Sequence, residues 1–144
     1  MIKNIIKILL VEDDPSDAEF IKDALYEFIL KKDLFHMENG ADALDFIFKK
    51  RRFELRKEED MPTLILLDLK SPKINGLEVL QIIKADENTK SIPVVIVTSS
   101  REEKDILNCY KYGANSFIVK PIDYKAFQST IKAVGEYWIR INQL

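Results

Sequence analysis

Short, almost purely apolar runs recur along this chain, and they constrain its fold more than any other feature of the sequence. Such runs occupy residues 5–11, 64–67, 94–97 and 117–119. Short runs without polar alternation are typical of strands that are buried on both faces of a parallel sheet. A fifth run, residues 34–37, is less apolar, so we expect that strand to lie nearer an edge of the sheet.

Helical patterns fill the gaps between the runs. Asp14 followed by Pro15 is typical of an N-cap and a first helical position. Asp123 is a candidate cap for a last helix over residues 124–142, which is long enough to extend beyond the sheet. Strands that alternate with helices five times predict an α/β sheet with right-handed crossovers.

Two of the connecting segments carry signals of their own. Ser100 and Glu103 form a capping-box pattern at the start of one helix, and Gly113 suits the C-terminal end of that helix. The stretch 49–60 is highly charged, which predicts a solvated helix end and loop.

Size and composition narrow the class of protein. The 144 residues are enough for one compact domain, and we expect a single domain over residues 1–144. The 22 basic residues nearly balance the 24 acidic ones, so nucleic acid is not the expected partner. Cys109 is the only cysteine, which excludes an internal disulfide and fits a reducing cytoplasm. The apolar run at the start of the chain is too short to span a bilayer, so we expect no membrane anchor.

Polar side chains follow four of the five predicted strands. They are Glu12, Asp13 and Asp14 after the first strand, Asp68 after the third, Thr98 after the fourth and Lys120 after the fifth. In open α/β sheets, sites form outside the carboxyl ends of the strands. We therefore expect carboxylates, a hydroxyl and an ammonium group to meet at one edge of the sheet.

The chemistry of this set favours phosphoryl transfer. Three carboxylates brought together repel one another unless a cation joins them, and Mg2+ suits a site with few carboxylates and room for phosphate oxygens. Asp68 can then act as a carboxylate nucleophile, while the metal and Lys120 neutralise charge on the transferred oxygens. The Thr98 hydroxyl can donate a hydrogen bond to the product.

The same residues resemble a known family. The segments 11–14 (VEDD) and 66–68 (LLD), Pro72 with Gly76, Thr98, and Lys120–Pro121 are similar to the receiver domains of bacterial response regulators over essentially the whole chain. The resemblance implies a flavodoxin-like (βα)5 fold, a doubly wound parallel sheet with strand order 2-1-3-4-5.

The resemblance also implies a set of metal ligands and a phosphoacceptor. Asp68 would be phosphorylated, Asp13 would bind Mg2+ directly, and Glu12 would act mainly through water. The backbone carbonyl of Lys70 would complete the metal site. The reaction would then be the protein's own phosphorylation and dephosphorylation, which describes a signalling protein rather than an enzyme.

Two further roles follow from the same likeness. Thr98 and Phe117 would form the switch pair that responds to phosphorylation, and Lys120 would contact the phosphoryl group. The Lys120–Pro121 bond is expected to be cis, which would aim the lysine inward.

The resemblance also points to partners. A histidine kinase would supply the phosphoryl group, and an unidentified downstream protein would receive the signal. The stretch 49–60 and the ending through residues 136–138 (EYW) look similar to phytochrome-associated single-domain regulators. That narrower likeness implies a phytochrome-type kinase and a homodimer formed partly through the C-terminal helix.

Some residues depart from the family pattern or have plainer interpretations. Lys70 and Ser71 replace residues that are commonly Asn and an apolar residue, so the Lys70 side chain could alter the phosphoryl lifetime. Phe117 replaces the Tyr of some relatives and has no hydroxyl to bond. We interpret His36 and Cys109 as structural, and Asp14 as a helix cap.

Three alternatives compete with the signalling hypothesis. A phosphatase with an aspartyl nucleophile usually has a second acid two residues later, and that position is Lys70. A flavin-binding protein needs a phosphate-cradling loop, and Glu12, Asp13 and Asp14 would repel that phosphate. A receiver-shaped scaffold that is never phosphorylated is disfavoured by the intact set of acids.

Overall fold

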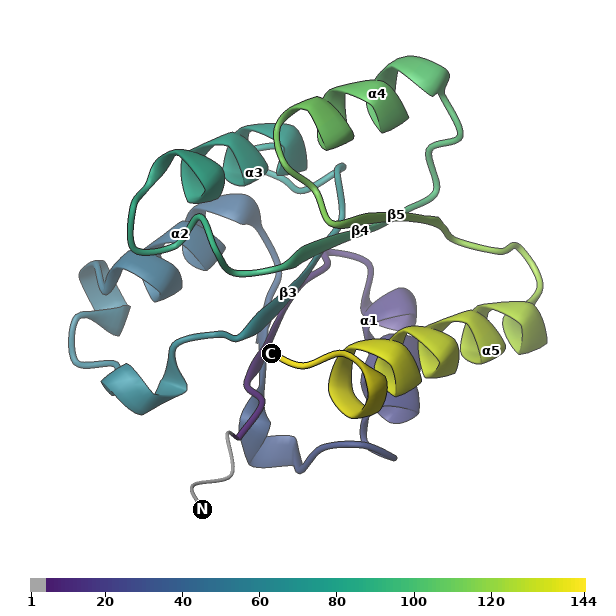
Figure 1. Cartoon of the computed structure of the whole chain (residues 1–144), viewed down its shortest axis with the longest axis horizontal. Coiled ribbons are helices and arrows are strands. Elements are labelled where there is room, and N and C mark those ends of the chain that lie inside the picture. The colour runs from purple at the N-terminus through teal and green to yellow at the C-terminus, as the bar shows by residue number, and fades with distance from the viewer. Residues whose placement is uncertain (1–4) are drawn as a thin grey trace.

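The computed structural model describes residues 5–144, and these residues fold around a five-stranded parallel sheet (Figure 1). The strands are β1 (Ile8–Val11), β2 (Leu34–Met37), β3 (Leu64–Leu67), β4 (Val94–Thr98) and β5 (Ser116–Val119). Their order is β2-β1-β3-β4-β5, and every neighbouring pair is parallel. The predicted flavodoxin-like α/β class and its strand order are confirmed.

Five α-helices cover the two faces of the sheet (Figure 1). They are α1 (Pro15–Leu25), α2 (Gly40–Phe48), α3 (Gly76–Ala85), α4 (Glu103–Lys111) and α5 (Tyr124–Gly135). Alternate strand residues point to opposite faces, so Leu9 packs with α2, α3 and α4, whereas Leu10 packs with α1 and α5. The core is therefore two apolar layers with the sheet between them.

The strand burial matches the position of each strand in the sheet. All residues of β1, β3 and β4 are buried, whereas β5 is half-buried along its whole length. The less apolar β2 lies at the other edge, as its sequence predicts. The first strand is shorter than its apolar run, because pairing begins at Ile8 and Ile5 is 61% exposed.

Helix caps explain where the helices begin. Asp14 accepts hydrogen bonds from two backbone N–H groups of the first turn of α1, and Asp123 accepts one from Ala126, so both predicted caps are confirmed. The predicted capping box of Ser100 and Glu103 is wrong, because α4 begins only at Glu103. The Ser100 hydroxyl instead donates to the Asp105 carboxylate at 2.5 Å.

The C-terminal helix continues α5 as the π-helical segment η4 (Glu136–Ile141). Trp138 and Ile139 pack against the core layer that α1 and α5 share. Gly135 allows this close packing, because a Cβ atom there would come within 2.7 Å of the Phe28 ring. Tyr137 and Ile141 remain 47% and 60% exposed.

The charged stretch 49–60 forms a loop with two short 3-10 turns, η2 (Arg51–Phe53) and η3 (Glu58–Asp60), as predicted. The Arg56 guanidinium fixes this loop by donating to the carbonyl oxygens of Phe46 and Ile47 at the end of α2. A third 3-10 turn, η1 (Lys31–Asp33), precedes β2. Within residues 5–144, none of the helices has the length and apolar character needed to cross a bilayer.

Candidate functional site

The carboxyl edge of the sheet collects the polar residues that follow the strands. Backbone hydrogen bonds extend the ladder by one residue beyond the strands, from Glu12 N to the Met37 carbonyl, from Asp68 N to the Val11 carbonyl and from Lys120 N to the Thr98 carbonyl. Because these residues are held in register with the sheet, their side chains project from one edge.

Three carboxylates meet at this edge. Glu12, Asp13 and Asp68 each have an oxygen atom within 4.8 Å of the others. Glu12 and Asp68 are 1% and 6% exposed, whereas Asp13 is open to solvent. Closely spaced carboxylate oxygens are the donors that a hard divalent cation prefers, so this donor set fits such a cation. The sequence predicted this cluster.

Lys120 extends from the end of β5 into the same cluster. Its Nζ donates to Glu12 Oε1 at 2.5 Å, to Asp17 Oδ2 at 2.8 Å and to Asp68 Oδ2 at 2.9 Å. An ammonium group has three N–H donors, so these three carboxylates use all of them. The side chain of Lys120 is only 8% exposed.

The prediction of a cis Lys120–Pro121 bond is wrong, because residues 5–144 contain no cis peptide bond. The trans isomer is the intrinsically preferred one for an X–Pro bond. Lys120 nevertheless points inward, since its Nζ donates to the buried carboxylates of Glu12 and Asp68.

Burial and charge together set the ionisation of the cluster. Burial alone would raise the pKa of Asp68, but hydrogen bonds from Lys120 and from the Lys70 backbone N–H lower it below its usual value. Burial and the neighbouring charge of Asp68 raise the pKa of Glu12, Lys120 offsets only part of this rise, and the resulting pKa is about 7. Burial would lower the pKa of Lys120, but its three carboxylate partners raise it. Asp68 is therefore an ionised carboxylate at neutral pH.

Two of the remaining predicted residues, Lys70 and Thr98, contact Asp68, and the third, Phe117, lies on β5. The Lys70 backbone N–H donates to Asp68 Oδ1 at 3.1 Å, while its side chain is exposed. Thr98 is fully buried at the end of β4, and its hydroxyl helps to lower the pKa of Asp68. Phe117 pairs with Ile96 and packs on the same core layer, which places it on the same sheet face as Thr98.

Asp17 is a site residue that the sequence analysis missed. It lies in the first turn of α1, three residues after the cap Asp14, and its backbone N–H donates to Asp14 Oδ1 at 3.0 Å. The only signal in the sequence is its spacing from that cap. Its position opposite Lys120 depends on how α1 packs, which the sequence does not state.

Two residues that we interpreted as structural occupy structural positions. His36 Nε2 lies 2.7 Å from the Glu12 carbonyl oxygen, which ties β2 to the end of β1. Cys109 is buried against α3 and the sheet, and burial raises the pKa of its thiol to about 11. A buried protonated thiol is a poor nucleophile.

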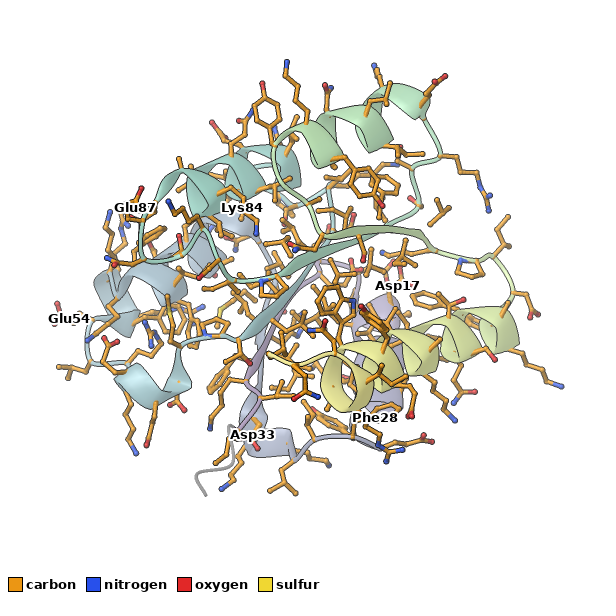
Figure 2. All side chains as sticks on the ribbon, viewed as in Figure 1. Asp17, Phe28, Asp33, Glu54, Lys84 and Glu87 are labelled. Carbon is orange, nitrogen blue, oxygen red and sulfur yellow. The ribbon has the colours of Figure 1, made fainter. Side chains whose placement is uncertain are left out.

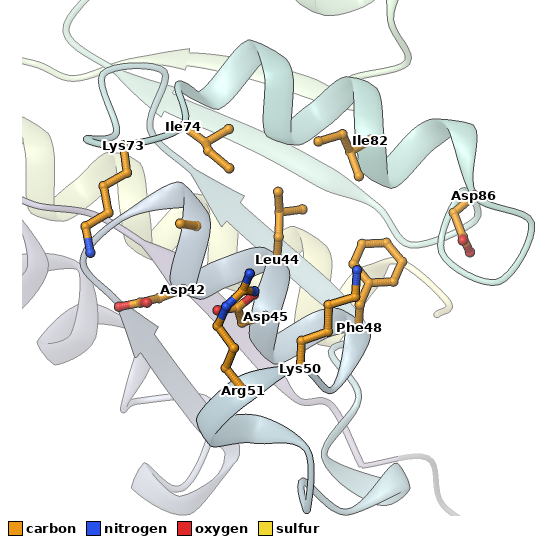
Figure 3. A pocket seen from close by; sticks show the side chains of 11 residues that line it. Asp42, Leu44, Asp45, Phe48, Lys50, Arg51, Lys73, Ile74, Ile82 and Asp86 are labelled. Carbon is orange, nitrogen blue, oxygen red and sulfur yellow. The ribbon is translucent and has the colours of Figure 1, made fainter.

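A separate hollow of about 700 Å³ lies between α2 and α3, away from the acidic cluster (Figure 3). Its floor is apolar, with Leu44 and Ile74 among the lining residues. Two of the charged lining residues pair with each other, since Arg51 contacts Asp45 at 2.7 Å. None of the predicted phosphorylation-site or metal-binding residues lines this hollow.

The fold and the site define an α/β protein whose parallel sheet gathers carboxylates and one lysine at its carboxyl edge. The family model for the response regulator receiver domain matches residues 8–132. The chain therefore belongs to the response regulator receiver domain family. It is a receiver domain of two-component signalling, and such domains are signalling proteins rather than enzymes that turn over a substrate. This membership decides against the phosphatase and flavin-binding alternatives.

Similar proteins cover nearly the whole chain. "Probable methanogenesis regulatory protein FilR2" of Methanothrix harundinacea is 33% identical over 136 residues, which are 94% of this chain and 85% of that protein. "Response regulator Rcp1" of Synechocystis sp. is 32% identical over 132 residues, which are 92% of this chain and 88% of that protein.

Two crystal structures show the same similarity. The Mn(2+)-bound form of response regulator Rcp1 has a TM-score of 0.91 and 31% identity, covering 97% of this chain and 99% of that chain. The phosphorylated cyanobacterial phytochrome response regulator RcpA has a TM-score of 0.90 and 32% identity, covering 96% of this chain and 97% of that chain. The narrower likeness to phytochrome-associated regulators is thus confirmed.

Proposed function

We propose that this chain is a stand-alone response regulator in a two-component phosphorelay, in which a histidine kinase transfers a phosphoryl group to Asp68. The observation that carries the proposal is the contact of Lys120 with Asp68 at 2.9 Å, beside two further carboxylates that share space for one cation. The coverage of 99% of the Rcp1 chain supports the stand-alone form.

We assign the cation as Mg2+. Asp13 and Asp68 would bind it directly with the backbone carbonyl of Lys70, and Glu12 would act mainly through water. When bound, Mg2+ neutralises negative charge on the phosphoryl oxygens. The exposure of Asp13 beside the buried pair supports this division, because the cation must enter from the solvent side.

The transfer step follows from the charge state of Asp68. A carboxylate oxygen attacks the phosphorus of the kinase's phosphohistidine, the P–N bond breaks, and its electron pair stays on the imidazole. Lys120 then donates to a phosphoryl oxygen instead of to the Asp68 carboxylate. Hydrolysis of the acyl phosphate later resets the protein. The exposed side chain of Lys70, which closely follows Asp68 in the sequence, would alter the lifetime of the acyl phosphate.

The signal would pass through Thr98 and Phe117. Phosphorylation adds about −1.5 to −2 charges at neutral pH, by analogy with other phosphorylated side chains, and attracts the Thr98 hydroxyl. Phe117 would fill the space that Thr98 leaves, and the half-buried β5 between α4 and α5 would change its surface. We expect an unidentified downstream protein, rather than nucleic acid, to read this surface.

A phytochrome-type histidine kinase is the proposed donor. The support is the similarity to Rcp1 and to RcpA, which is a cyanobacterial phytochrome response regulator. Phosphotransfer from purified sensor kinases of several classes measures this choice directly. We place the reaction in the cytoplasm, which is where a single unpaired cysteine is expected to stay reduced.

We also propose a homodimer that forms through the C-terminal helix. Tyr137 and Ile141 are the exposed apolar residues of η4, whereas Trp138 packs on the core. Light scattering of the parent should therefore show a dimer that Ile141→Asp dissociates without loss of folding. A parent that remains monomeric at high concentration contradicts the proposal.

The decisive experiment uses acetyl phosphate and Mg2+ as the phosphodonor system, with intact-protein mass spectrometry as the readout. We expect the parent to gain one phosphoryl group and Asp68→Asn to gain none. Asp23→Asn is the matched control, because it makes the same chemical change at an exposed position of α1. Equal labelling of Asp68→Asn and Asp23→Asn would overturn the assignment of Asp68, and an unlabelled parent would favour the scaffold alternative.

A further inference from the structure

Asp17 differs from the other carboxylates that contact Lys120. Glu12 and Asp68 belong to the group of acids whose oxygens lie within 4.8 Å of one another, and Asp17 does not. Asp17 nevertheless accepts a hydrogen bond from Lys120 Nζ at 2.8 Å. It is therefore the one partner of Lys120 that a cation bound by Glu12, Asp13 and Asp68 leaves in place.

The structure fixes Asp17 firmly. Its backbone N–H is held by the cap Asp14, and α1 packs on α5, where Phe20 stacks on Tyr124 with ring centroids 4.5 Å apart. Figure 2 shows Asp17 on the side of the molecule where α1 lies beside α5. The side chain of Asp17 is 27% exposed, so it joins Lys120 from the solvent side of the cluster.

We propose that Asp17 is a positioning residue that holds the Lys120 ammonium in place while phosphate chemistry occurs at Asp68. This inference rests on the proposed function of Asp68. During phosphorylation, an Asp68 oxygen forms a bond to phosphorus, the bond from phosphorus to the donor's leaving group breaks, and the electron pair leaves with that group. The Asp68 oxygen that accepted from Lys120 becomes part of an acyl phosphate, so one N–H of Lys120 turns to a phosphoryl oxygen.

Asp17 keeps its own hydrogen bond through this exchange. Lys120 is a flexible side chain with four methylene groups, and a second anchor from a different element restricts where its ammonium can lie. Without Asp17, Glu12 would be the only remaining anchor, and Glu12 is shared with the cation. We therefore expect Asp17 to affect the rate of phosphorylation much more than the affinity for Mg2+.

The test compares Asp17→Asn with Glu19→Gln in the full chain, using acetyl phosphate as the donor. Glu19 lies on the same helix, is 69% exposed and contacts Lys22 rather than Lys120, so its variant removes the same charge without the same contact. We expect Asp17→Asn to phosphorylate roughly tenfold more slowly at saturating donor, on the scale of one charge-assisted hydrogen bond. Glu19→Gln should match the parent, and Asp17→Glu should restore part of the rate.

Two further readouts separate positioning from a general structural effect. Calorimetric titration with Mg2+ should give Asp17→Asn an affinity within about twofold of that of Glu19→Gln, since both lose one screened charge. In a double-mutant cycle, Asp17→Asn should lower the urea unfolding midpoint of the parent but not of Lys120→Met. Equal shifts in both backgrounds, or an Asp17→Asn rate equal to that of Glu19→Gln, would overturn the inference alone. A parent that gains no phosphoryl group would instead overturn the proposed function, and this inference with it.

Discussion

Two lysines lie at opposite ends of the strands, one at the amino edge of the sheet and one at the carboxyl edge. Each is surrounded by carboxylates from neighbouring elements. Lys120 follows β5 and contacts Glu12, Asp17 and Asp68, as described above. Lys7 precedes β1 and contacts Asp33 at 2.7 Å and Asp60 at 3.4 Å. Figure 2 labels Asp33 far from Asp17, which shows how widely the two clusters are separated.

The two clusters differ in their balance of charge. Lys7 has two acidic partners, Asp33 immediately before β2 and Asp60 in the segment that leads into β3, so one lysine ties together the approaches to three neighbouring strands. Lys120 has three acidic partners, and Asp13 is a fourth acid beside them. The cluster at the amino edge is therefore a structural ion-pair cluster, whereas the carboxyl edge keeps an excess of negative charge that a further cation would neutralise.

The ionisation of the two lysines has different dominant causes. The hydrogen bond to Asp33 is the largest influence on Lys7, and it raises the pKa of that lysine. Burial is the largest influence on Lys120 and would lower the pKa, so the raised value depends on the carboxylates around it. An ammonium that is expensive to bury and is surrounded by excess acid is typical of a functional site rather than of a stabilising pair.

The largest expected effect is the difference in phosphorylation rate between variants of the two lysines. Lys120→Met should slow phosphorylation of Asp68 by acetyl phosphate about 10²–10³-fold, the range seen when one preorganised donor to a reacting oxygen is removed. Lys7→Met should leave the rate unchanged per folded molecule. Mass spectrometry at several reaction times measures both rates, and a Lys7→Met rate as low as that of Lys120→Met would remove the distinction between the edges.

The second effect concerns stability and is expected at the amino edge. Lys7→Met leaves the Asp33 carboxylate, whose side chain is 8% exposed, without its main partner, so the free energy of unfolding should fall by about 2–3 kcal/mol. Urea unfolding measures this loss. Adding Asp33→Leu to Lys7→Met should recover most of it, because both charges are then gone. A double variant as unstable as Lys7→Met would show that the unpaired Asp33 carboxylate is not the source of the lost stability.

The sequence predicted the carboxyl edge better than the amino edge, and the reason is geometric. Asp68 and Lys120 could be placed together because parallel strands send their carboxyl ends to one edge and because each follows an apolar run. The contact of Lys7 with Asp33 depends instead on how turns of irregular length approach β1 and β2. Strand order is regular, whereas turn geometry is not.

Other predictions failed for local reasons. The Ser100 capping box was wrong because Asp105, five residues away, competes for the serine hydroxyl. Asp17 was missed because it lies in the first turn of α1 and not directly after a strand, so its contact with Lys120 depends on how α1 packs. The roles of Thr98, Phe117 and the Lys70 carbonyl remain predictions, because they concern a phosphorylated or metal-bound state.

The third prediction uses Mg2+ to compare the edges. A ligand that binds only the folded state stabilises it by RT ln(1 + [L]/Kd), so Mg2+ at tenfold its Kd should add about 1.4 kcal/mol to the free energy of unfolding. Asp13→Asn should lose most of this Mg2+-dependent increment, and Asp33→Asn should keep it even though its own stability is lower. Thermal unfolding with Mg2+ and with EDTA measures the increments, and equal increments in the two variants would place the cation elsewhere.

The smallest expected effect tests whether Asp14, next to Asp13, is only a helix cap. Asp14 Oδ1 accepts from the backbone N–H groups of Ser16 and Asp17 at 2.9 and 3.0 Å, and it is not among the acids that share one cation site. Asp14→Ala should therefore cost about 1 kcal/mol of stability, while Asp14→Asn should cost little, because Asn caps helices equally well. Both variants should bind Mg2+ with an affinity within about twofold of that of the parent, since an exposed charge is screened by salt. Calorimetric titration with Mg2+ and urea unfolding measure the two quantities separately. A loss of Mg2+ affinity in Asp14→Asn as large as that in Asp13→Asn would show that the acidic site extends into α1 and that Asp14 helps to bind the cation.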